Sequence, residues 1–527
     1  MRDFQRSGRS MVYGEQGMVA TSHPLATLAG LDVLRAGGNA VDAALAAAAV
    51  LCVAEPQMTG IGGDVFALYA PAGGEVLALN GSGRAPGAAT PERFAELGVA
   101  AIGADSVHSV TVPGAVDAWC RLAEEHGSRP LEELLRPAVR LAEEGCLVQP
   151  RVARDWAVNA ARLSAHPATR ALFLPDGRPL AEGDRFRNPA LAATLRRIGR
   201  EGRAGFYEGP VRDDILRTLR DLGGLMTAED FAAQVSDWVA PIRTDYRGHT
   251  VYECPPNGQG VAALMILGTL AGTPADDPDA GPAERAHWLA EATKLAYAER
   301  DAVVGDPAFG AVPVADLLSD AAARSRRARI RPGAALPHPP PPHVEHKDTV
   351  YLCAVDRDGN AMSFINSLFD AFGSAITAPG SGVLLHCRGR SFRLSAGHPN
   401  AIAPGKRPLH TIIPGMVTKD GRTVMPFGVM GGQYQATGHA QFLLDVLGRG
   451  IEPQTALELP RSFAEGGVLR IETGFAPAVR DDLAARGHRV EWSSAPIGGG
   501  QAVWIDHARG VLAGASDPRK DGCALGW

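Results

Sequence analysis

The sequence is poor in aromatic residues and in cysteine, and its charges nearly balance. Phe, Trp and Tyr make up 6% of the 527 residues, so a core must be built mainly from Ala, Val, Leu and Ile. The seven cysteines are scattered, odd in number and without a CxxC pair, which argues against a disulfide framework and against a zinc site. A net charge of −6 is too mild to indicate a nucleic acid or an anionic membrane as partner.

Long apolar runs are also missing. The longest run, 43–54, is far shorter than the roughly 20 residues of a membrane-spanning helix, and it predicts a buried core helix instead. The charged residues 1–10 are not followed by the apolar region of a signal peptide. Together with the cysteine pattern, these absences predict a cytoplasmic protein that does not enter a membrane.

Glycine and proline, by contrast, are plentiful, with 62 and 39 residues. They mark breaks between helices and strands along the chain. The length of the chain suits either one large enzyme fold or three to four average domains. Helix signals begin at Pro24 and, after Gly37-Gly38, again at Ala40, which Asn39 can cap. The other predicted elements are a hairpin over 65–69 and 76–79, a mostly helical region over 110–235, strands around 246–252 and a helix carrying 287–300.

A proline-rich segment, 329–348, divides the chain. Its six prolines exclude a helix interior or a central strand, so an extended, exposed connector is predicted. Composition alone would make it an ordinary linker. It leads directly into a hairpin, however, with strands over 349–355 and 361–367 around an Asp-Gly turn. The first residue of that hairpin is Thr349.

Common catalytic and cofactor signatures are missing. The sequence has no GxSxG elbow, no HExxH zinc motif, no P-loop and no complete dinucleotide fingerprint. We therefore predict no cofactor and no metal. A threonine at a chain terminus can still be a nucleophile, because its own α-amine, with a pKa of about 7.7–8.0, takes the hydroxyl proton. Cutting the chain before Thr349 would create that terminus.

Several long motifs then carry a resemblance. They include residues 20–64 (from ATSHPLATLAG to MTGIGGD), VTVPGAVDAW, DYRGHTVYECPPNGQG, DTVYLCAVDRDGNAMS, FGVMGG and GASDPRKDG. In this order they resemble the gamma-glutamyltranspeptidase family of N-terminal nucleophile hydrolases over nearly the whole chain. The resemblance implies an α+β fold, a four-layer αββα sandwich, made as one precursor and cut between Asp348 and Thr349. Chains 1–348 and 349–527 would then form one domain as a heterodimer, which could dimerise further.

The resemblance also implies residue roles. Thr349 falls at the position of the processing threonine and nucleophile, and Ser367 at a hydroxyl residue that bonds it. Gly431 and Gly432 match the paired glycines whose amides form an oxyanion hole, where glycine permits close approach.

The clamp for a free γ-glutamyl group, however, is largely replaced. The family's carboxylate-binding arginine falls at Ser82, its asparagine at Phe369 and its amine-binding acid at Ser391. A paired serine motif becomes His410 and Thr411. Efficient γ-glutamyl transfer is therefore not expected, because a buried ammonium without its carboxylate partner costs several kcal/mol.

The pattern resembles instead a subgroup that includes oxamate amidohydrolase-like proteins and acylases for dicarboxylic acyl groups. We predict an amidohydrolase for a small carboxylate-bearing amide, with Arg388 and Arg84 as the leading candidates for the counter-charge and Arg390 as a third. His410, Thr411 and Gln433 are further substrate-binding candidates. Two alternatives remain open: a true gamma-glutamyltransferase or glutathione hydrolase, and an unprocessed, inactive relative with a binding role.

Overall fold

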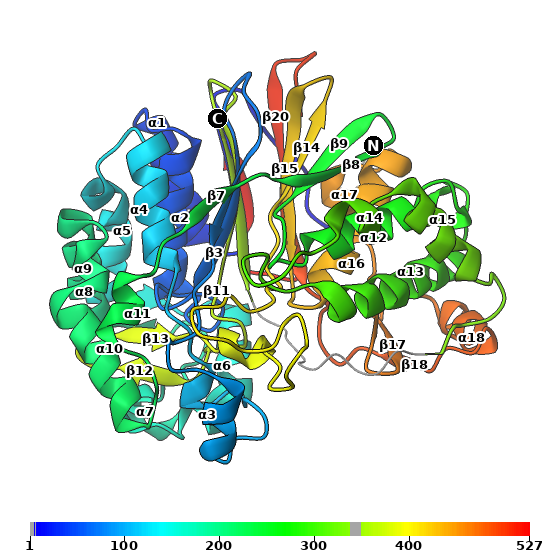
Figure 1. Cartoon of the computed structure of the whole chain (residues 1–527). Coiled ribbons are helices and arrows are strands. Elements are labelled where there is room, and N and C mark those ends of the chain that lie inside the picture. Colours follow the sequence, from blue (N-terminus) through cyan, green and yellow to red (C-terminus); the bar gives the residue numbers. More distant parts are fainter. Residues whose placement is uncertain (1–4, 6, 338–348) are drawn as a thin grey trace.

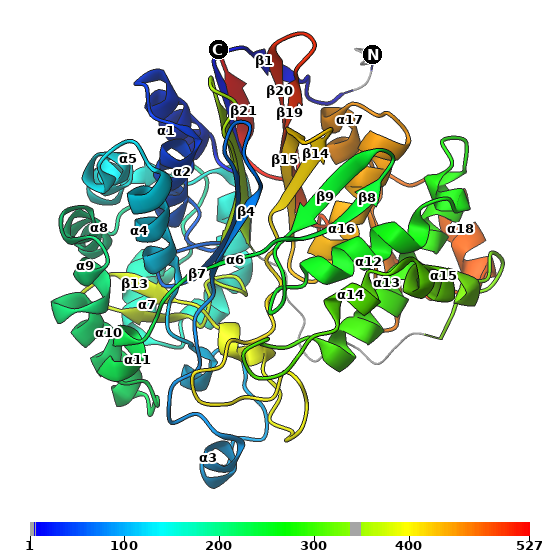
Figure 2. The same cartoon turned by 45° about the horizontal axis from the view of Figure 1, so that its top comes forward.

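The computed structural model describes residues 5, 7–337 and 349–527. Two seven-stranded sheets stand face to face in the centre of the molecule, and helices cover the outer face of each sheet (Figures 1 and 2). All strand pairs within these two sheets are antiparallel. The predicted four-layer αββα sandwich is confirmed.

The sheet that carries Thr349 combines strands from both sides of the proline-rich segment. Its order is β21 (Cys523–Gly526), β2 (Gly17–Thr21), β10 (Val350–Asp356), β11 (Ala361–Ser367), β3 (Asp64–Ala70), β4 (Leu77–Gly81) and β7 (Asp237–Val239). The predicted hairpin after Thr349 forms β10 and β11 at the centre of this sheet. The hairpin predicted over 65–69 and 76–79 forms β3 and β4 beside it.

The facing sheet is interleaved in the same way. Its order is β1 (Val12–Gly14), β20 (Val511–Ser516), β19 (Gly499–Asp506), β15 (Arg422–Met430), β14 (Gly415–Lys419), β9 (His249–Glu253) and β8 (Ile242–Tyr246). Both sheets therefore need strands from residues before and after the segment 338–348, so the two parts of the chain build one sandwich.

The central strands are buried on both faces, which explains their nearly continuous apolar sequence. Along β10, Val350, Leu352 and Ala354 pack under the helices, whereas Tyr351 and Cys353 pack toward the facing sheet. Successive side chains of a strand point to opposite faces, so both sets leave water. Small residues allow the tightest contacts, as where the Tyr351 ring occupies the space beside Gly428.

The helices against the first sheet begin with the two that the sequence predicts. They are α1 (Pro24–Arg35) and α2 (Ala40–Ala54), and every residue of α2 is buried. Asn39 and Asp42 form a capping box at the start of α2, as the sequence suggested. The same side carries α4 (Ala115–His126), α5 (Leu131–Glu144), α6 (Pro150–Leu163), α7 (Pro167–Phe173), α8 (Pro189–Glu201), α9 (Ala204–Tyr207), α10 (Gly209–Asp221) and α11 (Ala228–Ala232) (Figure 1).

The other helical layer covers the second sheet. Its main members are α12 (Gly260–Leu270), α13 (Pro282–Val303) and α16 (Tyr434–Leu443), with α14 (Val314–Leu317), α15 (Asp320–Arg329), α17 (Pro453–Glu458) and α18 (Pro477–Ala485) around them (Figure 1). The predicted helix over 287–300 is the central part of α13. No helix in the described part of the chain is both long and apolar enough to cross a bilayer.

The strands expected around 246–252 are β8 and β9, which join where Arg247 and Gly248 adopt positive φ and make a tight turn. One local prediction needs correction. The connector expected to be extended from Arg329 starts later: Arg329 ends α15, and Ile330 is buried against neighbouring helices. Asp348 and the rest of 338–348 lie outside the described residues.

Candidate active site

Thr349 and Ser367, the predicted nucleophile and its helper, lie side by side. Val350 pairs with Asn366 in the β10–β11 ladder, which places Thr349 opposite Ser367. Their side-chain oxygens, Oγ1 and Oγ, are 3.1 Å apart and both residues are fully buried. The Phe369 amide donates to Ser367 Oγ at 2.9 Å and fixes that hydroxyl from the other side. The hairpin geometry therefore brings two hydroxyls together at one strand end.

The predicted oxyanion pair lies in the sharp turn between β15 and α16. Gly431 and Gly432 have φ values of +123° and +59°, which residues with a side chain rarely adopt. The Tyr434 and Gln435 amides donate to the carbonyls of Gly431 and Gly432 and start the helix. Glycine at both positions is thus required by the backbone as well as by the role assigned to it.

The glycine turn and the two hydroxyls lie at the same edge of the sandwich. Tyr351, two residues after Thr349, packs on Gly428, three residues before Gly431. The Tyr351 hydroxyl and Ser363 Oγ are 2.8 Å apart, and Ser363 Oγ donates to the Phe427 carbonyl at 3.3 Å. Because β10 starts and β15 ends at this edge, the predicted catalytic groups converge there from facing sheets.

Next to Ser367, a buried carboxylate gathers three cationic or ionisable partners. Asp64 pairs with Ser367 in the β3–β11 ladder. Its Oδ2 accepts from His410 Nε2 at 2.9 Å and from Arg388 Nε at 3.3 Å, and His386 Nδ1 lies 3.0 Å away. Its Oδ1 accepts from the Gly83 amide at 2.9 Å. Arg388, Asp64 and both histidines are fully buried.

The charges in this cluster follow from burial and pairing. Burial alone would raise the pKa of Asp64, but His386 and His410 outweigh it and hold that pKa well below its usual range. The pKa of His410 is lowered to about 3: burial is the largest cause, and repulsion from Arg388 is the second. Burial also lowers the pKa of Arg388, to about 10, which leaves it protonated near neutral pH. Asp64 is thus ionised, His410 neutral and Arg388 cationic.

Arg388 is held between polar and aromatic neighbours. Its Nη1 donates to Thr411 Oγ1 at 3.1 Å, and its guanidinium lies 4.2 Å from the centre of the Phe369 ring. Its Nη2 has no hydrogen-bond partner among the residues that the structure describes. The structure therefore brings Arg388, His410 and Thr411 together beside Ser367.

A polar chain links Thr411 to the glycine turn. Gln259 Nε2 donates to the carbonyls of Thr411 and Gly432, at 2.7 and 3.1 Å. Arg300 Nη1 donates to Gln259 Oε1 at 2.5 Å and to Gln433 Oε1 at 2.8 Å. Gln433 thus joins the site through Arg300, and the backbone on both sides of the site is held by buried side chains.

Other sequence candidates lie apart from this cluster. Arg84 pairs with Asp237 at 3.5 Å and donates to the Gly405 carbonyl. Arg390 pairs with Asp370 at 2.6 Å. Ser391 donates to the Arg388 and Leu409 carbonyls, so at this position the chain has a structural hydroxyl instead of an acid. Of the three arginines, Arg388 is the one that contacts Asp64 and Thr411.

Sequence reasoning missed four residues of the site: Asp64, His386, Gln259 and Arg300. Asp64 follows the glycine-rich turn 60–63 and could have been flagged as an acid at the start of an apolar strand. Gln259 lies in the PPNGQG motif. His386 and Arg300 carry no local signal, because their role depends on contacts between segments distant in sequence.

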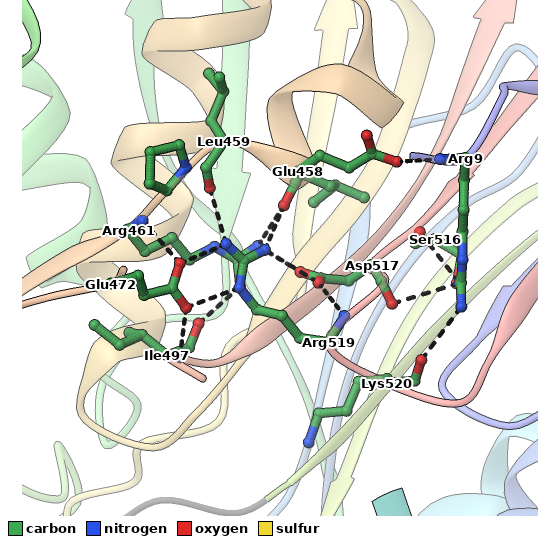
Figure 3. Close-up of polar contacts among 12 residues, drawn as sticks. Arg9, Glu458, Leu459, Arg461, Glu472, Ile497, Ser516, Asp517, Arg519 and Lys520 are labelled. Carbon is green, nitrogen blue, oxygen red and sulfur yellow. Dashed lines mark hydrogen bonds and ion pairs between the residues drawn. The ribbon is translucent and has the colours of Figure 1, made fainter. Parts of the chain in front are cut away.

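Residues of the C-terminal GASDPRKDG motif take part in an ion-pair network (Figure 3). Arg519 pairs with Glu472 at 2.5 Å, and Arg461 pairs with Asp517 at 2.5 Å. Arg461 Nη1 also donates to the Ile497 carbonyl, and Glu472 Oε1 accepts from the Ile497 amide, both at 2.8 Å. The network thus fixes the residue before Gly498, which packs against Gly431.

One group of metal-type ligands occurs in the described part of the chain, on α13 and near α18. His287, Glu291 and His488 place ligand atoms within 4.8 Å of one another. The Lys294 ammonium bonds Glu291 at 2.6 Å, however, and His287 bridges His488 and the Arg331 carbonyl, both at 2.8 Å. The Lys294 ammonium would repel a metal cation at this position. The cluster instead binds the backbone of Arg331 and Leu336 and so anchors this part of the chain.

The fold class and the comparisons agree. A sandwich of two antiparallel sheets between helical layers is the N-terminal nucleophile hydrolase fold. The crystal structure of a cephalosporin acylase from Bacillus halodurans superposes with a TM-score of 0.93 and 41% identity, covering 100% of this chain and 99% of that one. The chain also matches a gamma-glutamyltranspeptidase from Helicobacter pylori with a TM-score of 0.58 and 32% identity, over 63% of this chain and 95% of that one.

The chain belongs to the gamma-glutamyltranspeptidase family, whose profile matches residues 26–527. A glutathione hydrolase-like proenzyme of Bacillus subtilis (YwrD) is 37% identical, over 98% of this chain and 99% of the relative. The acylase ACY 1 proenzyme of a Pseudomonas species (strain SE83) is 35% identical, over 97% and 93%. The oxamate amidohydrolase proenzyme of Klebsiella pneumoniae is 34% identical, over 97% and 98%.

Proposed function

We propose that the protein is a self-processing amidohydrolase whose nucleophile is Thr349. The observation that carries the proposal is the buried Thr349 hydroxyl, 3.1 Å from Ser367 Oγ at the start of the central strand β10. The relatives named above as proenzymes support processing. The interleaving of strands from 1–337 and 349–527 supports a heterodimer that stays together after the cut.

Processing would begin with attack of Thr349 Oγ1 on the Asp348 carbonyl carbon. The peptide C–N bond breaks, its nitrogen takes the hydroxyl proton, and an ester joins Asp348 to Thr349 Oγ1. Water then hydrolyses the ester and releases the Asp348 carboxylate and a free threonine terminus. Ser367 supports this step as a hydrogen-bonding partner of the attacking hydroxyl.

Turnover would use the same hydroxyl with the new α-amine as base. The amine takes the Oγ1 proton, Oγ1 attacks the substrate carbonyl, and the Gly431 and Gly432 amides stabilise the oxyanion. Each such donor is worth about 10²–10³ in rate. The leaving amine receives the proton, and water cleaves the acyl-enzyme to regenerate Thr349.

For the substrate we propose a small amide that carries a carboxylate. Arg388 is buried and cationic, stacks on Phe369 and keeps an Nη2 group without a partner among described residues, which supports it as the carboxylate ligand. The acidic residue that would hold an α-ammonium is replaced by Ser391, whose hydroxyl donates to two backbone carbonyls. The substrates in the names of the oxamate and cephalosporin relatives support this choice.

The test compares Thr349→Ala with Thr349→Ser by intact mass. We expect wild type and Thr349→Ser to give two chains that split before residue 349, and Thr349→Ala to stay full-length and inactive. Splitting of Thr349→Ala at this bond would refute the assignment. An unsplit wild-type chain would favour the inactive, binding alternative.

A second measurement separates the substrate classes. Oxamate and glutaryl amides should be hydrolysed, whereas a γ-glutamyl anilide should be a poor substrate. Rapid release of the anilide with transfer to dipeptides would favour the gamma-glutamyltransferase or glutathione hydrolase alternative. The name of the Bacillus subtilis relative, a glutathione hydrolase-like proenzyme, supports testing it.

A further inference from the structure

A cavity of about 300 Å³ lies in the helical layer over the second sheet, between the first turns of α13 and the C-terminal end of α16. None of its lining residues belongs to the candidate active site. Leu289, Leu444, Leu459 and Phe475 give it apolar walls. Its volume is at the lower end of the range for small-molecule pockets.

One end of this cavity is strongly polar. Asp445, fully buried on a π-helical turn (Leu444–Gly448), lines the cavity together with Arg285 and Arg449. Both guanidiniums bond the same oxygen, Asp445 Oδ1, with Arg449 Nη1 at 2.9 Å. Asp445 Oδ2 has no hydrogen-bond partner within the described ranges. Irregular π turns within helices are frequent at functional sites.

The donors and acceptors at this end do not balance. Each guanidinium has five N–H groups, and each directs one of them to Asp445. Their side chains remain 17% and 23% exposed. The polar end thus offers spare cationic donors and a buried carboxylate oxygen without a partner, next to apolar walls. Buried oxygens without a partner cost stability, and a ligand that donates to Oδ2 would remove that cost.

We infer that this cavity binds a free α-amino acid with an apolar side chain. The ligand carboxylate meets Arg285 and Arg449, its ammonium donates to Asp445 Oδ2, and its side chain packs on Leu289, Leu444 and Phe475. A simple carboxylic acid would leave Oδ2 without a donor, and a simple amine would meet two guanidiniums. A zwitterion satisfies both ends at once.

Calorimetric titration of the complete wild-type protein, as purified, tests this site without using activity as the readout. L-leucine should bind, whereas 4-methylpentanoate, which lacks the ammonium, and L-leucinamide, which lacks the carboxylate, should each bind about tenfold or more weakly. No heat with L-leucine up to millimolar concentration would overturn the inference. Equal binding of 4-methylpentanoate or leucinamide would overturn it too, because the recognition would then not need both charged groups.

Variants locate the binding. Arg449→Gln should weaken L-leucine binding about tenfold or more, since it removes one cationic donor. Arg489→Gln, in an exposed pair with Glu491 elsewhere on the surface, is the matched control and should bind as wild type. Binding unchanged in Arg449→Gln would place the ligand elsewhere and refute the site. Because Thr349 is not involved, Thr349→Ala should bind L-leucine normally whether or not the proposed chemistry is correct.

Discussion

Gly431 and Gly498 pack backbone against backbone, with no room for a side chain between them. A Cβ atom on Gly431 would lie 2.8 Å from Gly498 Cα. Gly498 itself follows Ile497, whose amide and carbonyl are held by Glu472 and Arg461 (Figure 3). The predicted oxyanion turn is therefore set by contacts from the far C-terminal part of the chain.

Gly431→Ala should abolish activity beyond its cost in stability. The added methyl would clash with Gly498, and alanine would have to adopt the positive φ of Gly431. The turn must therefore shift, and its amides no longer point at the oxyanion. Gly421→Ala is the control, because Gly421 also has positive φ (+75°) but nothing within 4 Å. We expect about 1–2 kcal/mol lost in Gly421→Ala, a larger loss in Gly431→Ala because of the contact with Gly498, and at least a 100-fold loss of kcat/KM in Gly431→Ala alone. Equal activity in the two variants would contradict the oxyanion role.

Ser367→Ala should slow the cut before Thr349 without unfolding the protein. The change removes the hydroxyl 3.1 Å from Thr349 Oγ1, and we expect processing about tenfold slower or more. Ser374→Ala, which loses a buried hydroxyl bonded to the Leu385 carbonyl, serves as control. The half-time for conversion of precursor into two chains measures the effect. A half-time as short as that of Ser374→Ala would argue against Ser367 as helper.

Much of the fold could be predicted, because its signals are local. The caps at Asn39, the Gly37-Gly38 stop and the Asp-Gly hairpin turn each depend on a few neighbouring residues, and the structure has all three. The strands around 246–252 were predicted without the position of their turn, which falls at Arg247 and Gly248, where both residues adopt positive φ. The order of strands in the two sheets has no local signal and entered only through the family resemblance.

The site divides in the same way. Thr349, Ser367 and the glycine pair each lie in a recognisable motif, and the structure brings Thr349 and Ser367 together, while their catalytic roles stay predictions. Asp64 and His386 were not predicted, because burial and the meeting of β3 with residues 386–411 give them their role. For the same reason, sequence could not choose between its two leading arginines, Arg388 and Arg84, whereas the structure shows that Arg388 contacts Asp64.

Arg388→Lys should raise KM for a carboxylate-bearing amide such as oxamate. Lysine keeps the positive charge but loses the planar fork that bonds Asp64 and Thr411 and still presents Nη2. We expect KM to rise about tenfold or more, with a smaller change in kcat. Arg390→Lys, in a partly exposed pair with Asp370, should leave both constants nearly unchanged. A KM raised only by Arg390→Lys would move the carboxylate site to that residue.

His410→Gln should flatten the dependence of stability on pH between about 5 and 6.5. In the folded chain the pKa of His410 is lowered to about 3, whereas an unfolded histidine titrates near 6.5. Across this window the unfolded state binds one more proton, so the free energy of unfolding rises with pH, by up to about 1.4 kcal/mol per unit. Glutamine can still donate to Asp64 but does not titrate.

The measurement is urea unfolding at several pH values in the Thr349→Ala background, which we expect to stay as one chain. Other buried groups, such as His23, whose pKa is lowered by burial to about 4, are present in both proteins and cancel in the difference. Asp64 does not interfere, because its carboxyl is ionised in both states above about pH 5. Identical slopes in the two proteins would mean that His410 takes up its proton equally in both states, and would contradict a neutral, buried imidazole beside Arg388.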